Sequence, residues 1–441
     1  MSLKEIVSKS IIILVDLLAI FISIVVAYYT RMMFDNSFIT TFSHSLTTYL
    51  YFTPLYLLTL ALLAYEGIYT KRHDFWHESR QVIKAISLAF LFVLAFLAMT
   101  KSVEVYSRAT IFFTFILMAF FIPLFKNITK KLLFSYGLWG RPAKIYDDSS
   151  FIREEIYKNP YLGYIETDEE SAKTVFINSK NYTPKKLQEI INSAIQSSKE
   201  VIFIPLINEY NLTQSYIYEL SNTRTNLIVL KNRLRSRSRM LLHNLFNYFL
   251  ALLLLPILLP VIGLLAYLIK KESPGPVFFA HMRIGKDGKS IPTLKFRSMY
   301  SNAKDRLEKL LNEDPAIKAE WEKNFKLKDD PRVTKIGAIM RKTSLDELPQ
   351  IFNVLKGEMS FVGPRPVIQQ EIDQYYKEDA QYYFMVKPGI TGLWQVSGRS
   401  DTDYDFRVET DKWYVLNWSI WLDIVILFKT VKVVLFREGA Y

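Results

Sequence analysis

The sequence contains no cysteine and only five histidines among its 441 residues. The absence of cysteine excludes disulfide bonds, thiolate zinc sites and cysteine nucleophiles, and the histidines show no metal-binding spacing such as H-E-x-x-H. A bound metal ion would therefore be held mainly by carboxylates, which is the ligand preference of Mg²⁺ and Mn²⁺.

The chain is too apolar for an ordinary soluble protein. Half of its residues are hydrophobic and 15% are aromatic, so part of it belongs in a lipid bilayer. The net charge of +12 is compatible with nucleic-acid binding, but lysines and arginines beside apolar runs more often contact anionic lipid headgroups. The composition therefore favours membrane lipids, and not nucleic acid, as partners.

Four apolar runs predict a bundle of four membrane helices in residues 1–131. The first run follows Lys4 and Lys9 and lacks a small-residue cleavage pattern, so we expect a retained helix. Basic residues precede the first run, separate the second from the third and follow the fourth, which places both ends of the bundle in the cytoplasm. Asp16 is interpreted as a buried helix contact or a headgroup-level residue, with a functional intramembrane acid as the alternative. The other three runs are 48–65, 82–100 and 109–125.

Residues 132–235 predict a small α/β domain. Short strand-like runs alternate with helix-like stretches such as 185–196, which is typical of a parallel sheet. The first turn, GLWG at 137–140, lacks the G-x-G-x-x-G spacing of a nucleotide-binding loop. We therefore expect a Rossmann-like domain without a cofactor, in a structural or dimerising role. The strand-like runs are 143–146, 174–177, 201–205 and 227–230.

A fifth apolar run, 245–269, has basic residues on both sides. A spanning helix would export the C-terminal part of the chain, against the tendency of basic loops to stay inside. Pro256 and Pro260 interrupt the run. This pattern predicts a re-entrant hairpin that returns to the same membrane face, and a kinked fifth span is the alternative.

The segment 344–350, SLDELPQ, carries the adjacent carboxylates Asp346 and Glu347. Such a pair beside fixed cations suits phosphoryl chemistry, in which one acid attacks phosphorus or holds Mg²⁺ while arginines neutralise the oxygens. The alternative is structural, because Ser344 to Glu347 also fits an S-x-x-E capping box. Pro349 would fall beyond the first turn of a helix capped in this way, which favours acids in the approach to the helix. Either arrangement leaves Asp346 near a helix N-terminus, where a phosphate is also stabilised.

Cations gather around this pair in the C-terminal half. A predicted β-hairpin at 277–299 places Lys295 and Arg297 two residues apart on one strand, where they could meet a phosphate together. Turns such as KPGITG at 387–392 carry further cations, and clustered cations are costly unless anions neutralise them. The cluster therefore suggests a site for a doubly phosphorylated ligand. Its members are Lys295, Arg297, Arg341, Arg365 and Arg399, with Asp330 and Arg332 as structural or site residues.

Six ordered motifs make the C-terminal half resemble the bacterial sugar transferase family, the monotopic polyprenyl-phosphate phosphoglycosyl transferases. Before that half, the resemblance to the large members of the family is by architecture alone. The implied fold is a membrane α-helical bundle in 1–131, a Rossmann-like α/β domain in 132–235, and an α+β monotopic catalytic domain with a re-entrant membrane helix in 236–441. The motifs are SPGPV (273–277), KFRSM (295–299), SLDELPQ (344–350), NVLKG (353–357), FVGPRP (361–366) and KPGITG (387–392).

The resemblance implies transfer of a sugar 1-phosphate, with galactose or glucose favoured, from a UDP-sugar to undecaprenyl phosphate, with release of UMP. It implies that Asp346 attacks the β-phosphorus to give a covalent phosphosugar enzyme, that Glu347 is an acid-base partner or metal ligand, and that Asp346 and Glu347 hold Mg²⁺. Pro260 matches the break in the family's re-entrant helix, and Asp423 matches a family aspartate that is either catalytic or structural. Lys295, Arg297 and Arg365 match phosphate-contacting positions.

The same resemblance implies a homodimer in the bacterial inner membrane, with the catalytic domain on the cytoplasmic face, at the first membrane step of O-antigen, capsule or exopolysaccharide synthesis. Two alternatives stay open. The reaction could use an N-acetylated sugar, because no residue decides the sugar. The protein could instead be a catalytically inactive membrane scaffold for glycan assembly, although the presence of Asp346, Glu347 and Lys295 argues against this.

Overall fold

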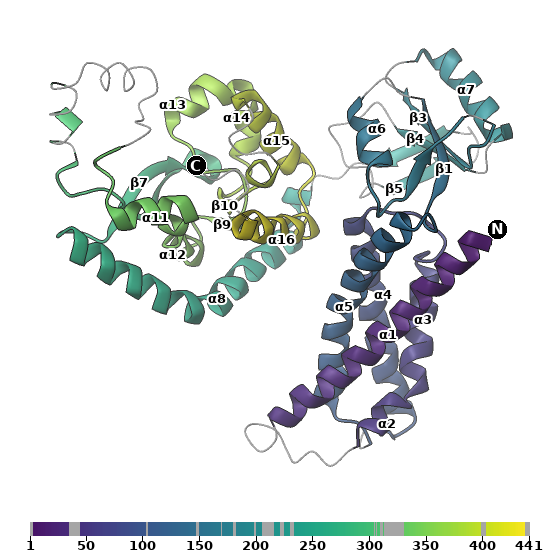
Figure 1. The fold of residues 1–441 in the computed structure, drawn as a ribbon. Helices are drawn as coiled ribbons and strands as arrows, with labels where there is room; N and C mark the ends of the chain where they lie inside the picture. The colour runs from purple at the N-terminus through teal and green to yellow at the C-terminus, as the bar shows by residue number, and fades with distance from the viewer. Residues whose placement is uncertain are drawn as a thin grey trace. The chain divides into compact units, whose positions relative to one another are not determined.

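The computed structural model divides into two compact units, Met1–Ile207 and Asn208–Tyr441 (Figure 1). The first unit contains the N-terminal helices and a parallel sheet, and the second contains the carboxylate pair. The described residues are 3–34, 45–102, 105–146, 150–168, 170–179, 182–197, 200–204, 216–220, 225–229, 233–303, 305, 307, 308, 312, 330–397 and 403–436.

Helices occupy all four N-terminal apolar runs, as predicted. The second run is divided between two helices, and Pro54 lies in the first turn of the longer one, where its missing N–H costs no hydrogen bond. Helix α1 lies along α5, and α3 along α4, around a core of small and branched residues that includes Ala19, Ile20 and Val82. The helices are α1 (Leu3–Met33), α2 (Leu46–Leu50), α3 (Thr53–Tyr65), α4 (Phe75–Met99) and α5 (Arg108–Ser135).

Two ion pairs lie buried within this unit. The Lys126 ammonium of α5 is 2.6 Å from the Asp16 carboxylate of α1, and both side chains are fully buried. The Tyr69 hydroxyl also donates a hydrogen bond of 2.7 Å to Asp16. One helical turn beyond Lys126, Lys130 pairs with Glu78 of α4. The prediction of Asp16 as a buried helix contact is thus confirmed, and two buried ion pairs connect α1 and α4 to α5 within the apolar bundle.

The α/β part of the first unit is built on a four-stranded parallel sheet with strand order β2-β1-β3-β4. Arg72, in the α3–α4 connection, stacks its guanidinium 3.9 Å from the Trp139 ring and donates to the carbonyls of Leu162 and Gly163, which ties the sheet to the bundle. The elements are β1 (Arg141–Tyr146), α6 (Ser150–Tyr157), β2 (Tyr164–Glu166), β3 (Thr174–Asn178), α7 (Pro184–Ser197) and β4 (Glu200–Ile204).

The fourth predicted strand, 227–230, does not join this sheet. Its residues 227–229 fall in β6 (Thr225–Val229), which pairs antiparallel with β5 (Tyr216–Leu220) in a separate two-stranded sheet, and residue 230 lies outside the described residues. The physical reason is the connection, because the few residues between the two strands allow a hairpin but not a parallel crossover. The parallel α/β architecture is confirmed, while its Rossmann-like character and the boundaries predicted at 131/132 and 235/236 stay predictions.

The second unit packs short helices and strands against one long helix, α8. Its core includes Phe296, Met340, Ile351 and Tyr414. The elements that follow the short helix Arg233–Arg235 are α8 (Arg237–Glu272), β7 (Phe278–Ile284), β8 (Ser290–Phe296), α11 (Lys335–Thr343), the 3₁₀ turn η6 (Leu345–Glu347), α12 (Gln350–Leu355), β9 (Ser360–Val362), α13 (Gln369–Glu371), a π-helical turn (Ile372–Tyr376), a 3₁₀ turn (Lys377–Asp379), α14 (Ala380–Tyr383), β10 (Gly389–Thr391), the 3₁₀ turn Trp394–Val396, α15 (Tyr404–Leu416) and α16 (Ile420–Phe436).

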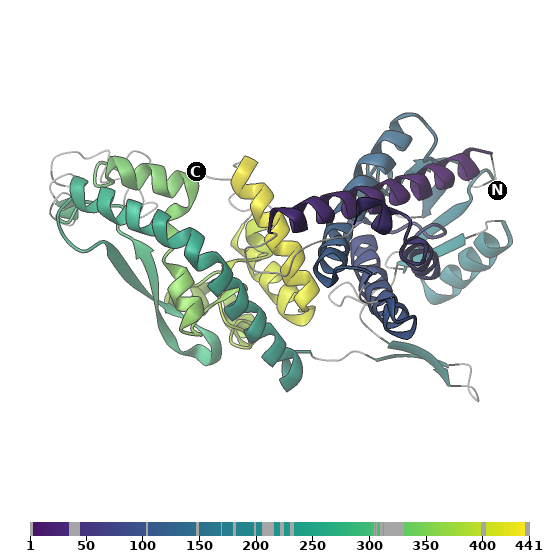
Figure 2. The same cartoon turned by 90° about the horizontal axis from the view of Figure 1, so that it is seen from below.

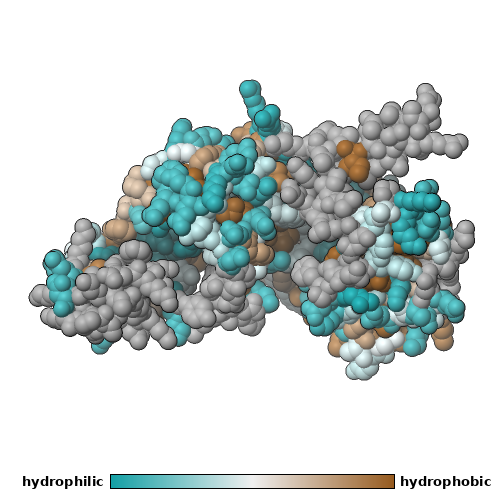
Figure 3. Space-filling view, turned by 90° about the horizontal axis from the view of Figure 1, so that it is seen from above, coloured by the Kyte–Doolittle hydropathy of each residue, from teal (hydrophilic) through white to brown (hydrophobic). Residues whose placement is uncertain are grey.

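Helix α8 is continuous through Pro256 and Pro260 and follows an arc in Figure 1. Figure 2 shows the same unbroken helix from below. Most of its large apolar side chains are exposed, including Leu252, Leu253 and Leu264. Figure 3 looks on the second unit from the side of α13–α15, where hydrophilic residues predominate. Among the described residues, five helices, α8 included and α2 and α3 counted as one, are long and apolar enough to cross a membrane.

Candidate active site

The carboxylate pair lies in a short turn between two helices. Helix α11 starts at the N-cap Thr334, whose hydroxyl accepts a hydrogen bond from the Gly337 N–H, and it ends at Ser344 in a left-handed conformation with φ 56°. The chain then forms η6 and starts α12 next to Pro349. Ser344 makes no side-chain cap. The capping-box alternative is therefore wrong, and the prediction of acids in the approach to a helix is confirmed.

The Lys295 ammonium lies close to both carboxylates. Its Nζ lies 2.7 Å from Oε1 of Glu347 and 3.8 Å from Oδ2 of Asp346. The half-exposed Arg365 guanidinium lies 3.5 Å from the same Glu347 oxygen. The side chains of Lys295, Asp346 and Glu347 are mostly buried, so their charges interact in a medium of lower effective dielectric than water. Three separate motifs thus meet at one point.

Burial raises the pKa of Asp346 above the ordinary value of an aspartate. The Lys295 charge opposes this increase, the neighbouring Glu347 charge adds to it, and the Arg341 charge opposes it. Desolvation destabilises the ionised form, and the nearby cations restore part of that stability. Asp346 is therefore a carboxylate whose charge depends on Lys295, in the kind of environment that functional acids occupy.

Asn353 is a positioning residue to which the sequence analysis assigns no role, although it lies in one of the six motifs. It is fully buried, accepts a hydrogen bond from the Leu294 N–H, and donates to Pro292 O and to Glu358. These bonds tie α12 to β8. Because η6 immediately precedes α12 and Lys295 lies on β8, Asn353 helps to hold the acids beside the lysine. A polar residue in an apolar helix was the available signal.

The FVGPRP and KPGITG motifs meet backbone to backbone. Strands β9 and β10 pair in parallel, and a Cβ atom on Gly363 would lie 2.5 Å from Lys387 O. A Cβ atom on Gly389 would lie 2.2 Å from Gly363 N. Only glycine permits this approach, which sets the position of the turn that carries Arg365.

Arg297 differs from the prediction that paired it with Lys295. Strand β8 ends at Phe296, so the alternation that would place the two residues on one face stops before Arg297. Its guanidinium instead donates to the carbonyls of Ser273 and Pro274. A Cβ atom on Gly275 would lie 2.3 Å from Nη1 of Arg297. This arginine joins the segment between α8 and β7 to the end of β8.

The other cations have mixed surroundings. Arg341 donates to the Ser298 hydroxyl over 2.9 Å while its charge acts on Asp346. Arg332 donates two side-chain hydrogen bonds to the Asp330 carboxylate, of 2.8 and 2.6 Å. Burial opposes a lower pKa at Asp330, but the Arg332 hydrogen bonds and charge outweigh it and lower the pKa. This contact favours the structural alternative for Asp330 and Arg332. Arg399 lies outside the described residues.

Asp423 is fully buried in α16. It accepts hydrogen bonds from the Tyr414 hydroxyl at 2.7 Å and from Trp418 Nε1 at 3.2 Å, and His243 Nε2 lies 3.3 Å away. Burial raises the pKa of Asp423, against the effects of these partners. The contacts join α8, α15 and α16, which favours the structural alternative for Asp423. Pro260 lies inside α8.

Comparison with known proteins identifies the family. Residues 238–437 match the family described as Bacterial sugar transferase. The chain belongs to this family and is a membrane-associated transferase. It is 38% identical to the undecaprenyl-phosphate galactose phosphotransferase of Salmonella typhimurium, over 85% of this chain and 84% of that protein. It is 37% identical to the UDP-galactose-lipid carrier transferase of Erwinia amylovora, over 85% and 84%. It is 31% identical to the UDP-glucose:undecaprenyl-phosphate glucose-1-phosphate transferase of Klebsiella pneumoniae, over 83% and 84%.

Proposed function

We propose that the protein transfers a sugar 1-phosphate from a UDP-sugar to undecaprenyl phosphate, giving undecaprenyl diphosphate sugar and UMP. The observation that carries this proposal is the mostly buried Asp346 beside Lys295, with Arg341 and Arg365 close to the same pair of acids. A nucleophilic carboxylate in a cationic site suits a substrate with two linked phosphates. The names of the three relatives support a lipid-phosphate acceptor and either galactose or glucose as the sugar.

The reaction has two displacements at one phosphorus atom. An Asp346 oxygen forms a bond to the β-phosphorus, and the bond from that phosphorus to the bridging oxygen breaks, so that UMP leaves with the electron pair. An oxygen of undecaprenyl phosphate then attacks the same phosphorus and releases Asp346. A covalent intermediate lets one carboxylate site serve a soluble donor and a lipid acceptor in turn.

The cations stabilise the charge that develops during each displacement. Lys295 pairs with Glu347 and opposes the rise in the pKa of Asp346, while the half-exposed Arg365 side chain can face a phosphate oxygen. Such charge-assisted contacts are the main means by which proteins catalyse phosphoryl transfer. Glu347, next to the nucleophile, is positioned for acid-base work at the attacking or leaving oxygen.

Mg²⁺ is proposed as the cofactor, with Asp346 and Glu347 as its protein ligands. No group of three or more His, Asp or Glu side chains that could hold a metal occurs within the described residues. Two adjacent carboxylates nevertheless fit this ion, which commonly takes one or two carboxylates and completes its shell with substrate phosphates and water. When bound, the ion would neutralise diphosphate charge. Loss of UMP release on chelation, restored by Mg²⁺, tests the assignment.

We infer that α8 is re-entrant and that the second unit lies on the cytoplasmic face of the inner membrane. The arc of α8, its two internal prolines and its exposed apolar residues support this placement. A C-terminal tag that is accessible only from the outer face of sealed vesicles would instead establish a fifth span. A homodimer that involves the Rossmann-like α/β domain is also proposed, and a monomeric mass in native-like lipid would count against it.

Replacement of Lys295 by methionine tests the electrostatic support of the nucleophile. The pKa of Asp346 is already raised by burial, and the Lys295 charge limits the rise. The nucleophilic form is the carboxylate, so activity increases as pH rises through this pKa. Without the lysine, the pKa rises further, and the acidic limb of kcat/KM for UMP release should move upward by about one pH unit or more.

A lysine that only binds phosphate would give a different result. In that case the Lys295→Met variant would show a lower plateau of kcat/KM, but its acidic limb would stay in place. The matched control is Lys289→Met in the exposed turn of the same hairpin. This control should keep both the plateau and the limb.

The reaction itself is tested by a panel of UDP-sugars with the purified full chain, Mg²⁺ and undecaprenyl phosphate. We expect UMP release with UDP-galactose or UDP-glucose, and the sugar with the highest kcat/KM identifies the donor. If UMP is released only with N-acetylated donors, then the proposed reaction stands and the proposed sugar is wrong. If a folded protein releases no UMP with any of these donors, the result would favour the alternative of a catalytically inactive scaffold for glycan assembly.

A further inference from the structure

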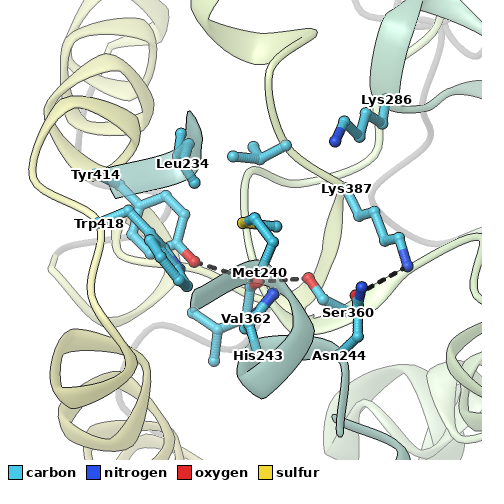
Figure 4. A pocket seen from close by; sticks show the side chains of 11 residues that line it. Leu234, Met240, His243, Asn244, Lys286, Ser360, Val362, Lys387, Tyr414 and Trp418 are labelled. Carbon is cyan, nitrogen blue, oxygen red and sulfur yellow. Dashed lines mark hydrogen bonds between the residues drawn. The ribbon is translucent and has the colours of Figure 1, made fainter. Parts of the chain in front are cut away.

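A small pocket in the second unit shares no residue with the carboxylate site. It lies where the first two turns of α8 meet β9, the loop before β10 and the end of α15. Figure 4 shows Lys286 and Lys387 on one side, Tyr414 and Trp418 on the other, and His243 and Asn244 from α8 at the bottom. The cavity volume is about 100 Å³, which is room for a phosphate-sized group and far less than a nucleotide pocket needs.

The cations of this pocket have no acidic partner in the part of the chain that the structure describes. Among the described residues, neither Lys286 nor Lys387 forms an ion pair, and Lys387 donates only to the Asn244 side-chain oxygen, over 3.3 Å. Burial lowers the pKa of Lys387, and the nearby Lys286 charge lowers it further. Two lysines that converge on a partly apolar cavity repel each other and lose hydration, costs that a bound anion offsets.

His243 adds a directional group. Its side chain is more than nine-tenths buried, and Nε2 lies 3.3 Å from the Asp423 carboxylate. The other ring nitrogen, Nδ1, is buried and has no hydrogen-bond partner among the described residues. A buried polar atom without a partner is costly, and this one belongs to a residue that lines the pocket. A phosphate oxygen or hydroxyl would satisfy it.

The charges favour a phosphate monoester. The only carboxylate that the described residues place beside His243 is Asp423, 3.3 Å from its Nε2, so the two lysines remain to be neutralised. A phosphate monoester carries about −1.5 to −2 charges at pH 7, which matches two lysines, whereas a diester carries only one. The same first turns of α8 that contribute His243 and Asn244 carry Leu241, Leu242 and Leu245 on their exposed face, each more than half exposed. An apolar chain attached to the phosphate can lie along these residues.

We propose that this pocket binds the phosphate monoester head of a membrane lipid through Lys286, Lys387 and His243. The site is separate from the transfer reaction, and its occupancy does not depend on catalysis. Two lipids share the required chemistry, phosphatidic acid and a polyprenyl phosphate. The phosphate fills the cavity, and the lipid chain packs on the exposed leucines at the start of α8.

The test measures lipid binding to the purified full chain by native mass spectrometry in a neutral detergent. The probes are dioleoyl phosphatidic acid, undecaprenyl phosphate, dioleoylglycerol and inorganic phosphate. The variants are Lys286→Gln and His243→Gln, in which the glutamine amide can still donate to Asp423. The matched control is Lys289→Gln, which removes an exposed lysine from the same turn. Circular dichroism verifies that each variant is folded.

We expect both pocket variants to bind at least one lipid monoester about tenfold more weakly, while Lys289→Gln binds as the native chain does. Dioleoylglycerol should not bind at this site. Equal affinity in all four proteins would overturn the proposal, and so would inorganic phosphate that binds as tightly as the lipids. The lipid whose affinity changes most identifies the source of the phosphate. UMP release measures the transferase proposal, and binding of dioleoyl phosphatidic acid, which is not a substrate of the proposed reaction, measures the pocket, so failure of one is distinguishable from failure of the other.

Discussion

Replacement of Asp346 by asparagine should reduce UMP release by about 10⁴-fold or more, the scale of loss seen when a covalent nucleophile is removed. Asparagine has the same shape but lacks the negative oxygen that forms the bond to phosphorus. The side chain is partly buried and its ion pair with Lys295 is long, at 3.8 Å, so the substitution should leave the fold intact. The loss should appear in kcat at saturating donor.

The covalent step can be observed separately from turnover. Without the lipid acceptor, the native chain incubated with its UDP-sugar should gain the mass of a sugar phosphate, and Asp346→Asn should not. The control is Asp405→Asn, an equivalent change at an exposed carboxylate in α15, which should preserve both the adduct and UMP release. Native-like turnover by Asp346→Asn would falsify the assignment of the nucleophile.

The sequence predicts those parts of the site whose residues lie in recognisable motifs. The association of Asp346, Glu347 and Lys295 follows from residue type and from the order of the motifs, because paired acids need nearby cations and short turns hold them in place. Prediction from local sequence pattern fails where a strand or helix ends within the motif, because the side chains beyond that end no longer follow its periodicity. Arg297 was placed beside Lys295 on a strand that in fact stops at Phe296, and its N–H groups go to backbone carbonyls.

Long-range contacts limit the prediction in the same way. Ser344 fits a capping box by spacing alone, but its left-handed backbone depends on how α11 ends. Asn353 and Asp423 obtain their roles from partners many residues away, so no local spacing reveals them. The parallel sheet was predictable from alternation, whereas the pairing of 227–230 depended on a neighbouring strand that the sequence pattern did not indicate.

The largest effect on stability is expected at the ion pair between α1 and α5. Replacement of Lys126 by methionine should lower the free energy of unfolding by about 3–5 kcal/mol, the usual cost of leaving one buried charge without its partner. Asp16 would then keep only the Tyr69 hydrogen bond in a place without solvent. Asp16→Asn should cost a similar amount, because it leaves the Lys126 ammonium unpaired. A denaturant titration in mixed micelles measures both.

The double variant Asp16→Asn with Lys126→Met separates the cost of an unpaired charge from the contribution of the pair. A buried ion pair often contributes little net stability compared with neutral residues of similar size, and the asparagine can still accept the Tyr69 hydrogen bond. We therefore expect the double variant to recover most of the loss and to lie within about 1–2 kcal/mol of the native chain. Lys131→Met, at an exposed position of the same helix, should change little. If the two single losses simply add in the double variant, then the two charges are not coupled, and the cost of each replacement has a cause other than its lost partner.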